Sequence, residues 1–402
     1  MVTLALTEMT SWGVLYYAFT VFINPMHASF HWSRSEMTGA FSLALLVSAL
    51  AGIPVGRWLD RHGPRMLMTL GSCAAALLVL AWASVQNLAQ FYVVWLCIGL
   101  AMAAVLYEPA FVVVATWFRR RRGQALTVLT LVAGLASVIY VPLAGLLVAG
   151  MPWRRAIVVL ALLLAAGTIL PHAFVLRRGP EQMGLLPDGA AGAPPEAAAR
   201  SERSVGARDA MHGATFWLLV AAFLLNALGI GAVQVHLVPY LIDRGQTPQF
   251  AAQMIGLTGI MALPGRLVLT PLGERVPRSI IACCIFLLQA LALLALLVTS
   301  SIVGIAAFVV LFGAGFGAVT PARAALVGDF YGAANYGAIS GALAFFLTGS
   351  RGVAPVAAAA LYDLTGGYHS VLLALVGTSM LAAVLVLLAE RSGRSLRPTA
   401  TT

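Results

Sequence analysis

Three arginines lie inside long apolar stretches of the sequence, at Arg266, Arg323 and Arg351. The planar guanidinium group presents paired N–H donors that match the two oxygens of a carboxylate. The comparable acid inside an apolar stretch is Glu108, so three cations face one anion. An excess of positive charge in a partly desolvated cavity favours an anionic ligand. These residue types therefore predict recognition of a small organic anion.

The three arginines differ in their surroundings. Arg351 lies near the middle of its stretch, in a Gly-Ser-Arg-Gly string, and Arg266 follows a Pro-Gly pair. Both predict substrate contact, and the alternative for each is a structural ion pair or a side chain that snorkels to the membrane surface. Arg323 is nearer the end of its stretch, six residues before Asp329, where snorkelling or pairing with that acid is an equal alternative.

The remaining candidate side chains are acids, tyrosines and a histidine. Glu108 is either a counter-ion that neutralises an arginine or a group that carries a proton, and the sequence leaves both open. Glu8, by contrast, is expected to lie at a helix entrance, where the helix dipole favours an acid. Tyr17, Tyr140 and His236 are candidates for contact with the substrate, although each could equally pack structurally.

Composition defines the elements that must hold these side chains. The chain of 402 residues is 61% hydrophobic and only 9% charged, whereas a soluble domain carries about 25% charge. Continuous apolar runs of about twenty residues predict membrane-spanning helices, since backbone polar groups in lipid must be bonded within the protein. The four cysteines have no metal-ligand spacing. We therefore expect no metal and no cofactor, only a proton or a counter-anion as the coupling species.

The apolar runs predict twelve spans in an all-α integral membrane protein. The expected spans are 9–29, 36–58, 66–85, 90–118, 123–149, 154–176, 213–241, 249–272, 277–298, 302–331, 335–361 and 369–390. Residues 177–212 contain Pro194 and Pro195 among scattered charges and indicate a flexible cytoplasmic linker. The expected domains are an N-terminal bundle at 1–176, a C-terminal bundle at 213–392 and a tail at 393–402.

The arginine distribution predicts the orientation. The 24 cations are all arginine. With a cytoplasmic N-terminus, seventeen fall in inner loops and ends, and four fall in outer loops. Positive residues accumulate on the cytoplasmic side of membrane proteins, so both termini are expected there. The formal charge of +10 then reflects topology and contact with lipid, and nucleic-acid binding is not expected. The bias towards alanine, leucine, valine and arginine is typical of a GC-rich bacterial genome. We therefore expect the protein in a bacterial inner membrane.

A short loop motif recurs in the two halves. Gly56, Asp60, Arg61, Gly63 and Arg65 follow the second span, and an acid–arginine pair, Glu274 and Arg275, follows the eighth. Such an internal repeat is typical of transporters built from two related bundles. The loop after span two can pair with the end of a neighbouring helix and so latch one access state; the alternative is a solvated turn.

Beyond these patterns, nearly the whole chain resembles the monocarboxylate transporter family and the related oxalate:formate antiporter family of the major facilitator superfamily. The resemblance rests on Glu108-Pro109-Ala110, on Trp117-Phe118 followed by four arginines, and on Ala133-Gly134. It implies a fold of twelve helices in two pseudo-symmetric six-helix bundles. In the oxalate:formate type, basic residues in spans eight and eleven hold the substrate carboxylates, which correspond to Arg266 and Arg351 here.

The chain also departs from the animal monocarboxylate pattern. Ala262 replaces an aspartate four residues before Arg266, and the aligned place of a span-one lysine is near Tyr17. The family's proton route therefore does not transfer to this chain. We expect secondary transport of a mono- or dicarboxylate, by proton symport or anion exchange, in a protein that works as a monomer.

Two other classes of function stand against this expectation. Efflux of hydrophobic compounds by proton antiport is the alternative within transport, and it requires an acid-rich, aromatic cavity. A sensor would need a soluble output domain, and an enzyme would need clustered catalytic or metal-binding side chains. The sequence presents neither feature, so we expect no enzymatic activity.

Overall fold

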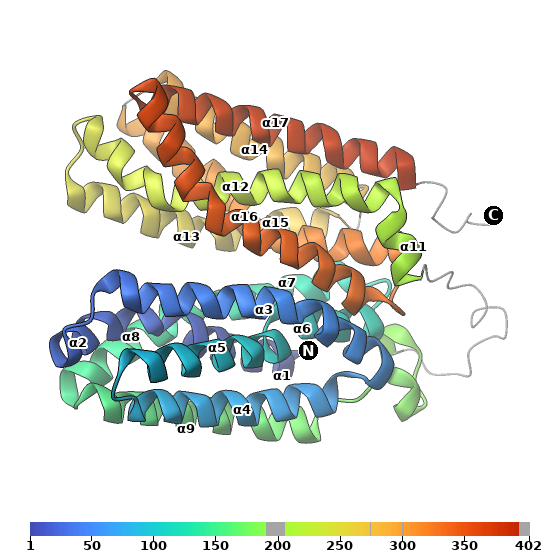
Figure 1. The fold of residues 1–402 in the computed structure, drawn as a ribbon. Coiled ribbons are helices and arrows are strands. Elements are labelled where there is room, and N and C mark those ends of the chain that lie inside the picture. Colours follow the sequence, from blue (N-terminus) through green and yellow to red (C-terminus); the bar gives the residue numbers. More distant parts are fainter. Residues whose placement is uncertain (190–205, 274, 300, 394–402) are drawn as a thin grey trace. The chain divides into compact units, whose positions relative to one another are not determined.

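The computed structural model describes residues 1–189, 206–273, 275–299 and 301–393, and every regular element within them is helical. The contacts divide the chain into two units (Figure 1). Unit 1 comprises residues 1–200 and 333–345, and unit 2 comprises residues 201–332 and 346–402. The first residues of one helix, α16, therefore belong to unit 1 and its remainder belongs to unit 2.

Unit 1 is a helical bundle followed by a short folded segment. Its helices are α1 (Val2–Trp12), the π-helical turn η1 (Gly13–Tyr17), α2 (Phe19–Phe30), α3 (Arg34–His62), α4 (Pro64–Ser84), α5 (Leu88–Val105), α6 (Tyr107–Trp117), α7 (Arg122–Gly134), α8 (Ala136–Gly150) and α9 (Trp153–Phe174). Two 3-10 turns follow, η2 (Pro180–Met183) and η3 (Pro187–Gly189).

In its described residues, unit 2 contains the short helix α11 followed by six long helices. They are α11 (Ala207–His212), α12 (Ala214–Asp243), α13 (Pro248–Leu272), α14 (Arg278–Val298), α15 (Ile302–Tyr331), α16 (Tyr336–Thr365) and α17 (Tyr368–Gly393). Glycines allow α13 and α15 to pack backbone against backbone. Gly265 faces Ala314, and Gly317 faces the carbonyl of Ala262, with no room for a Cβ at either glycine. Small residues serve the same purpose between helices in membranes.

Eleven helical stretches of the described residues are long and apolar enough to cross a membrane. They agree with eleven of the twelve expected spans. The remaining one, expected at 9–29, is formed by α1, η1 and α2, which are each too short to cross alone. The expected all-α fold of spanning helices is confirmed, and the first span is an interrupted helix.

Proline explains a second interruption, between α5 and α6. Pro109 is the third residue of α6, so it has no N–H for the carbonyl of Val105, and its ring clashes with that carbonyl. Leu106 consequently adopts an extended conformation (φ −94°, ψ −163°). The break leaves Glu108 in the first turn of α6.

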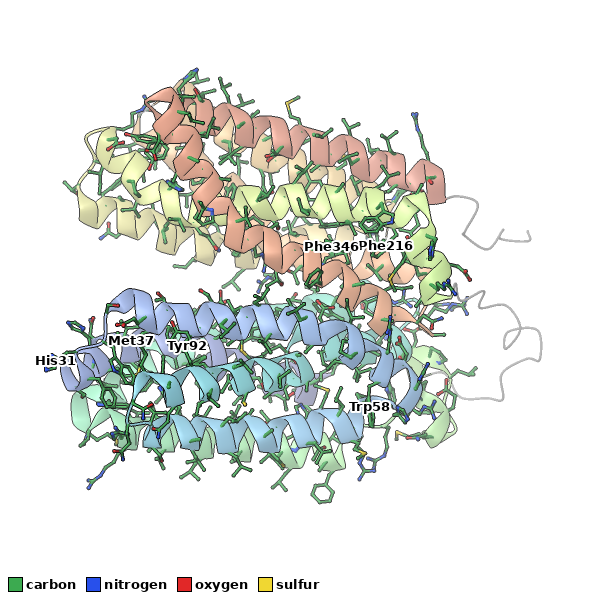
Figure 2. All side chains as sticks on the ribbon, in the orientation of Figure 1. His31, Met37, Trp58, Tyr92, Phe216 and Phe346 are labelled. Atoms are coloured by element: carbon green, nitrogen blue, oxygen red, sulfur yellow. The ribbon has the colours of Figure 1, made fainter. Side chains whose placement is uncertain are left out.

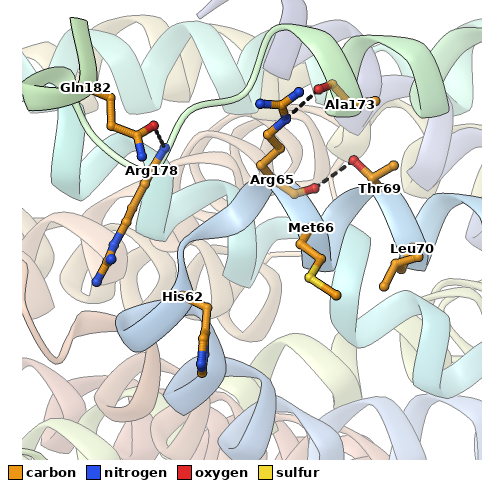
Figure 3. A pocket seen from close by; sticks show the side chains of 8 residues that line it. All are labelled: His62, Arg65, Met66, Thr69, Leu70, Ala173, Arg178 and Gln182. Carbon is orange, nitrogen blue, oxygen red and sulfur yellow. Dashed lines mark hydrogen bonds between the residues drawn. The ribbon is translucent and has the colours of Figure 1, made fainter.

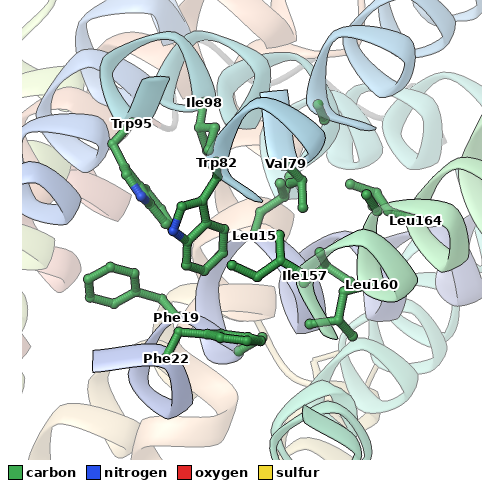
Figure 4. Packing of buried hydrophobic residues seen from close by; sticks show 14 of the residues in the cluster. Leu15, Phe19, Phe22, Val79, Trp82, Trp95, Ile98, Ile157, Leu160 and Leu164 are labelled. Carbon is green, nitrogen blue, oxygen red and sulfur yellow. The ribbon is translucent and has the colours of Figure 1, made fainter. Parts of the chain in front are cut away.

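Aromatic side chains fill the core of unit 1 (Figure 4). Phe19 stacks on Phe41 with ring centroids 4.6 Å apart, and Trp82 meets Trp95 edge-on at 5.0 Å. Offset and edge-on pairs add about 0.5–1.5 kcal/mol each to the burial of their surfaces. This packing holds η1 and α2 against α4 and α5.

Residues 177–189 correct the expectation of a flexible linker over 177–212. Arg178 donates from Nη2 to the carbonyl of Arg61 at 2.7 Å and packs against Gly63, which lies between α3 and α4. The segment from Arg177 to Gly189, which we call the strap, is therefore folded against the ends of α3 and α4. Pro194 and Pro195 lie outside the described residues.

Candidate functional site

Glu108 lies at the broken span of unit 1, where a carboxylate is well placed. Its carboxylate accepts a hydrogen bond from the hydroxyl of Ser340, 2.5 Å from Oε2. The position in the first turn of α6 also brings the acid to the positive end of a helix dipole. Discontinuous helices at membrane depth commonly form the ion and substrate sites of transporters. The arrangement is compatible with both roles expected for Glu108.

Glu8 is a second buried acid, which the sequence interpretation missed. It is not at a helix entrance but in the middle of α1, with a side chain that is fully buried. Within the described residues neither carboxylate oxygen has a hydrogen-bond partner. Acids inside spanning segments are rare and commonly functional, so Glu8 is a candidate for a role in transport. The sequence interpretation placed Glu8 at the beginning of a helix because the first strongly apolar run begins close to this residue. The structure shows that the helix already begins at Val2.

Aromatic rings surround the interrupted first span. The Trp12 ring lies 4.9 Å from that of Tyr107, and Tyr16 lies 5.1 Å from Tyr17. Tyr140 is buried, packs over Gly13 and donates to the hydroxyl of Thr10 at 3.0 Å. Tyr17 is half-buried in this cluster, whereas Tyr140 joins α8 to α1. Substrate contact by either tyrosine stays a prediction.

Arg266 in unit 2 satisfies a carbonyl that a proline leaves open. Pro321 in α15 has no N–H for the carbonyl of Gly317, one turn earlier. Arg266 donates from Nε to that carbonyl at 3.0 Å. The bond fixes the guanidinium plane by its Nε edge, so that the terminal nitrogens form the other edge. A fixed planar fork is the geometry with which arginine binds carboxylates.

Arg351 and Arg323 have opposite exposures. Arg351, midway along α16, has an exposed side chain, although its backbone packs against Gly231 of α12. Arg323 is buried in α15 with 7% of its surface exposed. The snorkelling alternative for Arg323 is therefore wrong, because a snorkelling guanidinium would reach the surface. Asp329 forms an ion pair with Arg278 at 2.6 Å, and pairing between Arg323 and Asp329 stays a prediction.

His236 forms a junction between three helices of unit 2. Its Nε2 lies 2.9 Å from the carbonyl of Pro355, and its Nδ1 lies 3.1 Å from the hydroxyl of Tyr368. A neutral ring that donates from Nε2 and accepts at Nδ1 satisfies both contacts. Both ring nitrogens are thus engaged in this conformation, and a contact between His236 and substrate stays a prediction.

The motif expected in the loop after span two lies largely within α3, because that helix continues to His62, and its Asp60 holds the beginning of α16. Asp60 accepts hydrogen bonds from the backbone N–H groups of Gly337 at 2.9 Å and Ala338 at 3.0 Å. These are first-turn donors without a partner inside their own helix. The carboxylate therefore caps α16 and meets the positive end of its dipole. We call this contact the Asp60 cap.

Paired glycines bring the two helices close enough for the cap. A Cβ on Gly56 would overlap the carbonyl of Gly337, and a Cβ on Gly341 would overlap that of Gly52. Both helices thus carry two glycines four residues apart, the spacing with which helices pack closely in membranes. This spacing is visible in the sequence and is the signal that could have located the contact.

Other members of the motif shape the turn. Gly63 has φ +79°, a conformation that glycine adopts without strain, and Pro64 then begins α4. Arg61 and Arg65 are exposed. The carbonyl of Arg61 accepts a hydrogen bond from Arg178 of the strap, whereas Arg65 contacts Ala173 at the end of α9. In the second half Arg275 is exposed, and Glu274 lies outside the described residues.

Comparison with known proteins identifies the family. The family model described as the Major Facilitator Superfamily matches residues 3–354 and 268–402. The chain belongs to the Major Facilitator Superfamily.

Relatives and solved structures refine this assignment. An uncharacterized MFS-type transporter, YcxA of Bacillus subtilis, is 25% identical over 87% of this chain and 85% of its own length. Monocarboxylate transporter 13 of Bos taurus is 28% identical over 78% of this chain and 71% of its own. The fold matches that of the transporter FucP in the outward conformation, with a TM-score of 0.75, 14% identity, and coverage of 96% and 97%. The chain is thus a multi-pass membrane protein of a transporter family, and its resemblance to monocarboxylate transporters is confirmed.

The transporter carries one further acid that the sequence interpretation missed, Asp188 in the strap. Its carboxylate accepts from the backbone N–H groups of Arg120 at 2.8 Å, Arg121 at 3.1 Å and Arg119 at 3.2 Å. Burial opposes the charged form, but these N–H donors outweigh it and hold the pKa of Asp188 below its ordinary value of 3.8. The strap is thereby anchored at the start of α7.

We expect Asp188→Ala to release the strap from this loop. Three N–H groups lose their acceptor, so trypsin should cleave after Arg119–Arg122 about tenfold faster in detergent-solubilised protein, measured by mass spectrometry of the fragments. Because the pKa is lowered on docking, the stabilisation is present at neutral pH and is lost as pH falls below about 4. Asp209→Ala, on α11, is the matched control and should leave the cleavage rate unchanged. Equal rates in Asp188→Ala and wild type would contradict the anchor.

Proposed function

We propose that the protein is a secondary transporter of small organic anions, namely mono- or dicarboxylates, which works by alternating access. The carrying observation is the exposed guanidinium of Arg351 halfway along a spanning helix. A cation at this depth costs several kcal/mol in lipid, so such residues face water-filled pathways or partners and mark the routes of substrates and ions. Its charge and shape favour a carboxylate.

Arg266 supports the same proposal from a second helix. The hydrogen bond from Nε to Gly317 already orders the side chain of Arg266. Binding of an anion therefore costs less side-chain entropy than binding to a mobile arginine would. A ligand held by two arginines on α13 and α16 would be clamped through two forks. The similarity to monocarboxylate transporter 13 is consistent with a carboxylate as substrate.

For coupling we propose proton symport, with Glu8 as the proton carrier and Glu108 as its partner. Glu8 is buried in α1 and forms no hydrogen bond of normal geometry within the described residues, and α1 packs against α6, which carries Glu108. An acid inside a membrane-spanning segment commonly marks a proton or ion pathway. Anion exchange is the alternative for coupling. The protein would lie in a bacterial inner membrane with both termini cytoplasmic.

One observation favours a second function, efflux of hydrophobic cations by proton antiport. Unit 1 combines the two acids with the rings of Trp12, Tyr16 and Tyr107, and cations bind to such aromatic faces. The arginines of unit 2 oppose this function, because they would repel a cationic substrate. A susceptibility screen in a strain without other pumps tests it, and expression should not change resistance if the anion proposal is right.

The proposal itself is tested by uptake of a labelled carboxylate panel into proteoliposomes. We expect at least one mono- or dicarboxylate to accumulate, and neutral amides of the same shape to be excluded. Uptake of the amides at rates equal to those of the acids would overturn the proposal, because an amide has no charge for the arginines.

The coupling proposal gives a separate prediction for Glu8. Glu8→Gln keeps the volume of the side chain and removes the titrating group. We expect this variant to lose about 90% or more of the uptake driven by an inward proton gradient while keeping exchange of internal for external substrate, measured in the same vesicles. Glu36→Gln, at the exposed capping position of α3, is the control. If Glu8→Gln retains gradient-driven uptake, Glu8 is not the proton carrier.

A further inference from the structure

A cavity of about 510 Å³ lies in unit 1 between the strap and the junction of α3 with α4 (Figure 3). The anion pathway and the Asp60 cap do not use it. It is bounded by the last turn of α3, the first two turns of α4, the end of α9 and the strap. Its lining residues are His62, Arg65, Met66, Thr69, Leu70, Ala173, Arg178 and Gln182.

Two arginines and a histidine line this cavity: Arg65, Arg178 and His62. Arg65 uses only Nε for its bond to Ala173, and Arg178 uses only Nη2 for its bond to Arg61. His62 contacts the carbonyl of Trp58 through Nδ1 at 3.3 Å. In the described part of the chain no carboxylate forms an ion pair with these three side chains. The remaining guanidinium nitrogens are thus available to a ligand.

Three acids lie near the cavity in the sequence, and within the described residues none of them forms an ion pair with Arg65 or Arg178. The carboxylate of Glu181 lies over Gly179. Asp60, two residues before His62, is committed to the N–H groups of Gly337 and Ala338. Asp188, in the strap, is committed to the backbone of the Arg119–Arg121 loop. The guanidinium groups of Arg65 and Arg178 therefore lack an ion-pair partner among the described residues, and their charge favours an anion.

The other side of the cavity is apolar and exposed. Met66 and Leu70, one turn apart on α4, are 59% and 57% exposed, and Phe174 at the end of α9 is 67% exposed. α4 is a membrane-spanning helix, and these residues lie in its first turns. Its outward-facing apolar surface continues at Leu77. A positive pocket thus opens beside a surface suited to hydrocarbon chains, at the level where headgroups meet the bilayer core.

We propose that this cavity binds the phosphate headgroup of an anionic phospholipid, with acyl chains along Met66 and Leu70. Arginine matches phosphate oxygens through paired donors, and basic pockets between membrane helices bind anionic headgroups. Trp58, labelled in Figure 2, stacks on His62 with ring centroids 4.3 Å apart and keeps that ring at the pocket edge. The proposal is independent of the transported substrate.

A phospholipid headgroup and inorganic phosphate offer the same oxygens to the arginines, so the experiment must distinguish these two ligands. Purified protein is delipidated in detergent and titrated with phosphatidylglycerol, with phosphatidylcholine of the same chains, or with inorganic phosphate, and bound lipid is counted by native mass spectrometry. We expect phosphatidylglycerol to bind at least tenfold more tightly than phosphatidylcholine. Inorganic phosphate at millimolar concentration should not displace it.

Variants locate the site. Each arginine near an anionic headgroup is worth about fivefold in affinity, so Arg65→Gln with Arg178→Gln should weaken phosphatidylglycerol binding about 25-fold. Arg391→Gln, which removes an exposed arginine at the end of α17, is the matched control and should change nothing. Arg65→Gln alone should weaken binding about fivefold. Its elution volume and helical content should equal those of wild type, which shows that the loss of binding is not caused by misfolding.

Three results would overturn the proposal. The double variant binds phosphatidylglycerol as wild type does, or the control variant loses as much affinity as the double variant. Alternatively, inorganic phosphate displaces the lipid at millimolar concentration, which would assign the pocket to a free anion.

Discussion

Arg351→Ala is expected to reduce carboxylate uptake by about 100-fold, the largest loss for any single substitution in unit 2. A charge-assisted hydrogen bond contributes about 1.5–3 kcal/mol, and a bidentate arginine makes two of them. Arg351→Lys should retain part of the activity, about a tenth, because the charge remains and the planar fork is lost. Initial rates in proteoliposomes over a range of substrate concentrations measure both effects.

Controls separate a binding defect from a folding defect. The exposed side chain of Arg351 makes its removal tolerable for the fold, so the melting temperature of Arg351→Ala should stay within about 2 °C of wild type. Arg266→Ala should lower both transport and stability, because the carbonyl of Gly317 loses its donor. Arg391→Ala is the matched substitution outside both regions. If both alanine variants transport as well as wild type, the anion clamp does not exist.

The second large effect is expected for the Asp60 cap. Asp60→Ala removes the acceptor for two N–H groups at the start of α16, and with it the favourable charge at the helix dipole. We expect hydrogen exchange at Gly337 and Ala338 to accelerate by about 100-fold and uptake to fall by at least about tenfold. Mass-resolved exchange on peptides that cover residues 333–345, together with transport rates, measures the two quantities.

A control on the same helix makes this test specific. Asp363→Ala removes an exposed acid near the other end of α16 and should change neither exchange at residues 337–338 nor uptake. Asp60→Asn keeps an acceptor oxygen without the charge, so an intermediate result is expected. Unchanged exchange in Asp60→Ala would show that the carboxylate does not hold α16.

Local patterns predicted much of the fold. Long apolar runs set the spans because hydrocarbon leaves no other partner for backbone polar groups. Pro109 also marks a helix break in the sequence, although the notion of a single span over 90–118 passed over it. The π-helical turn at residues 13–17 has no comparable signal, because it contains neither proline nor a polar cluster.

The candidate site was less predictable because burial and partnership depend on tertiary packing. The apolar surroundings of Arg266 and Arg351 singled them out, but nothing local indicated that Pro321 would leave a carbonyl for Arg266. Glu8 was missed since its neighbours in space come from other helices. Asp188 was missed because a proline-rich, charged segment has the composition of a disordered linker, and its order comes from N–H groups about 70 residues earlier in the chain.

The shared helix α16 has a mechanical consequence. Gly337, which the Asp60 cap holds, and Arg351, which is proposed to hold the substrate, lie fourteen residues apart on one helix. No loop separates the two residues in the chain. An anion that binds Arg351 and shifts α16 would therefore also disturb the hydrogen bonds between Asp60 and the first turn of this helix. Binding of substrate and release of the Asp60 cap would then be coupled through a single helix.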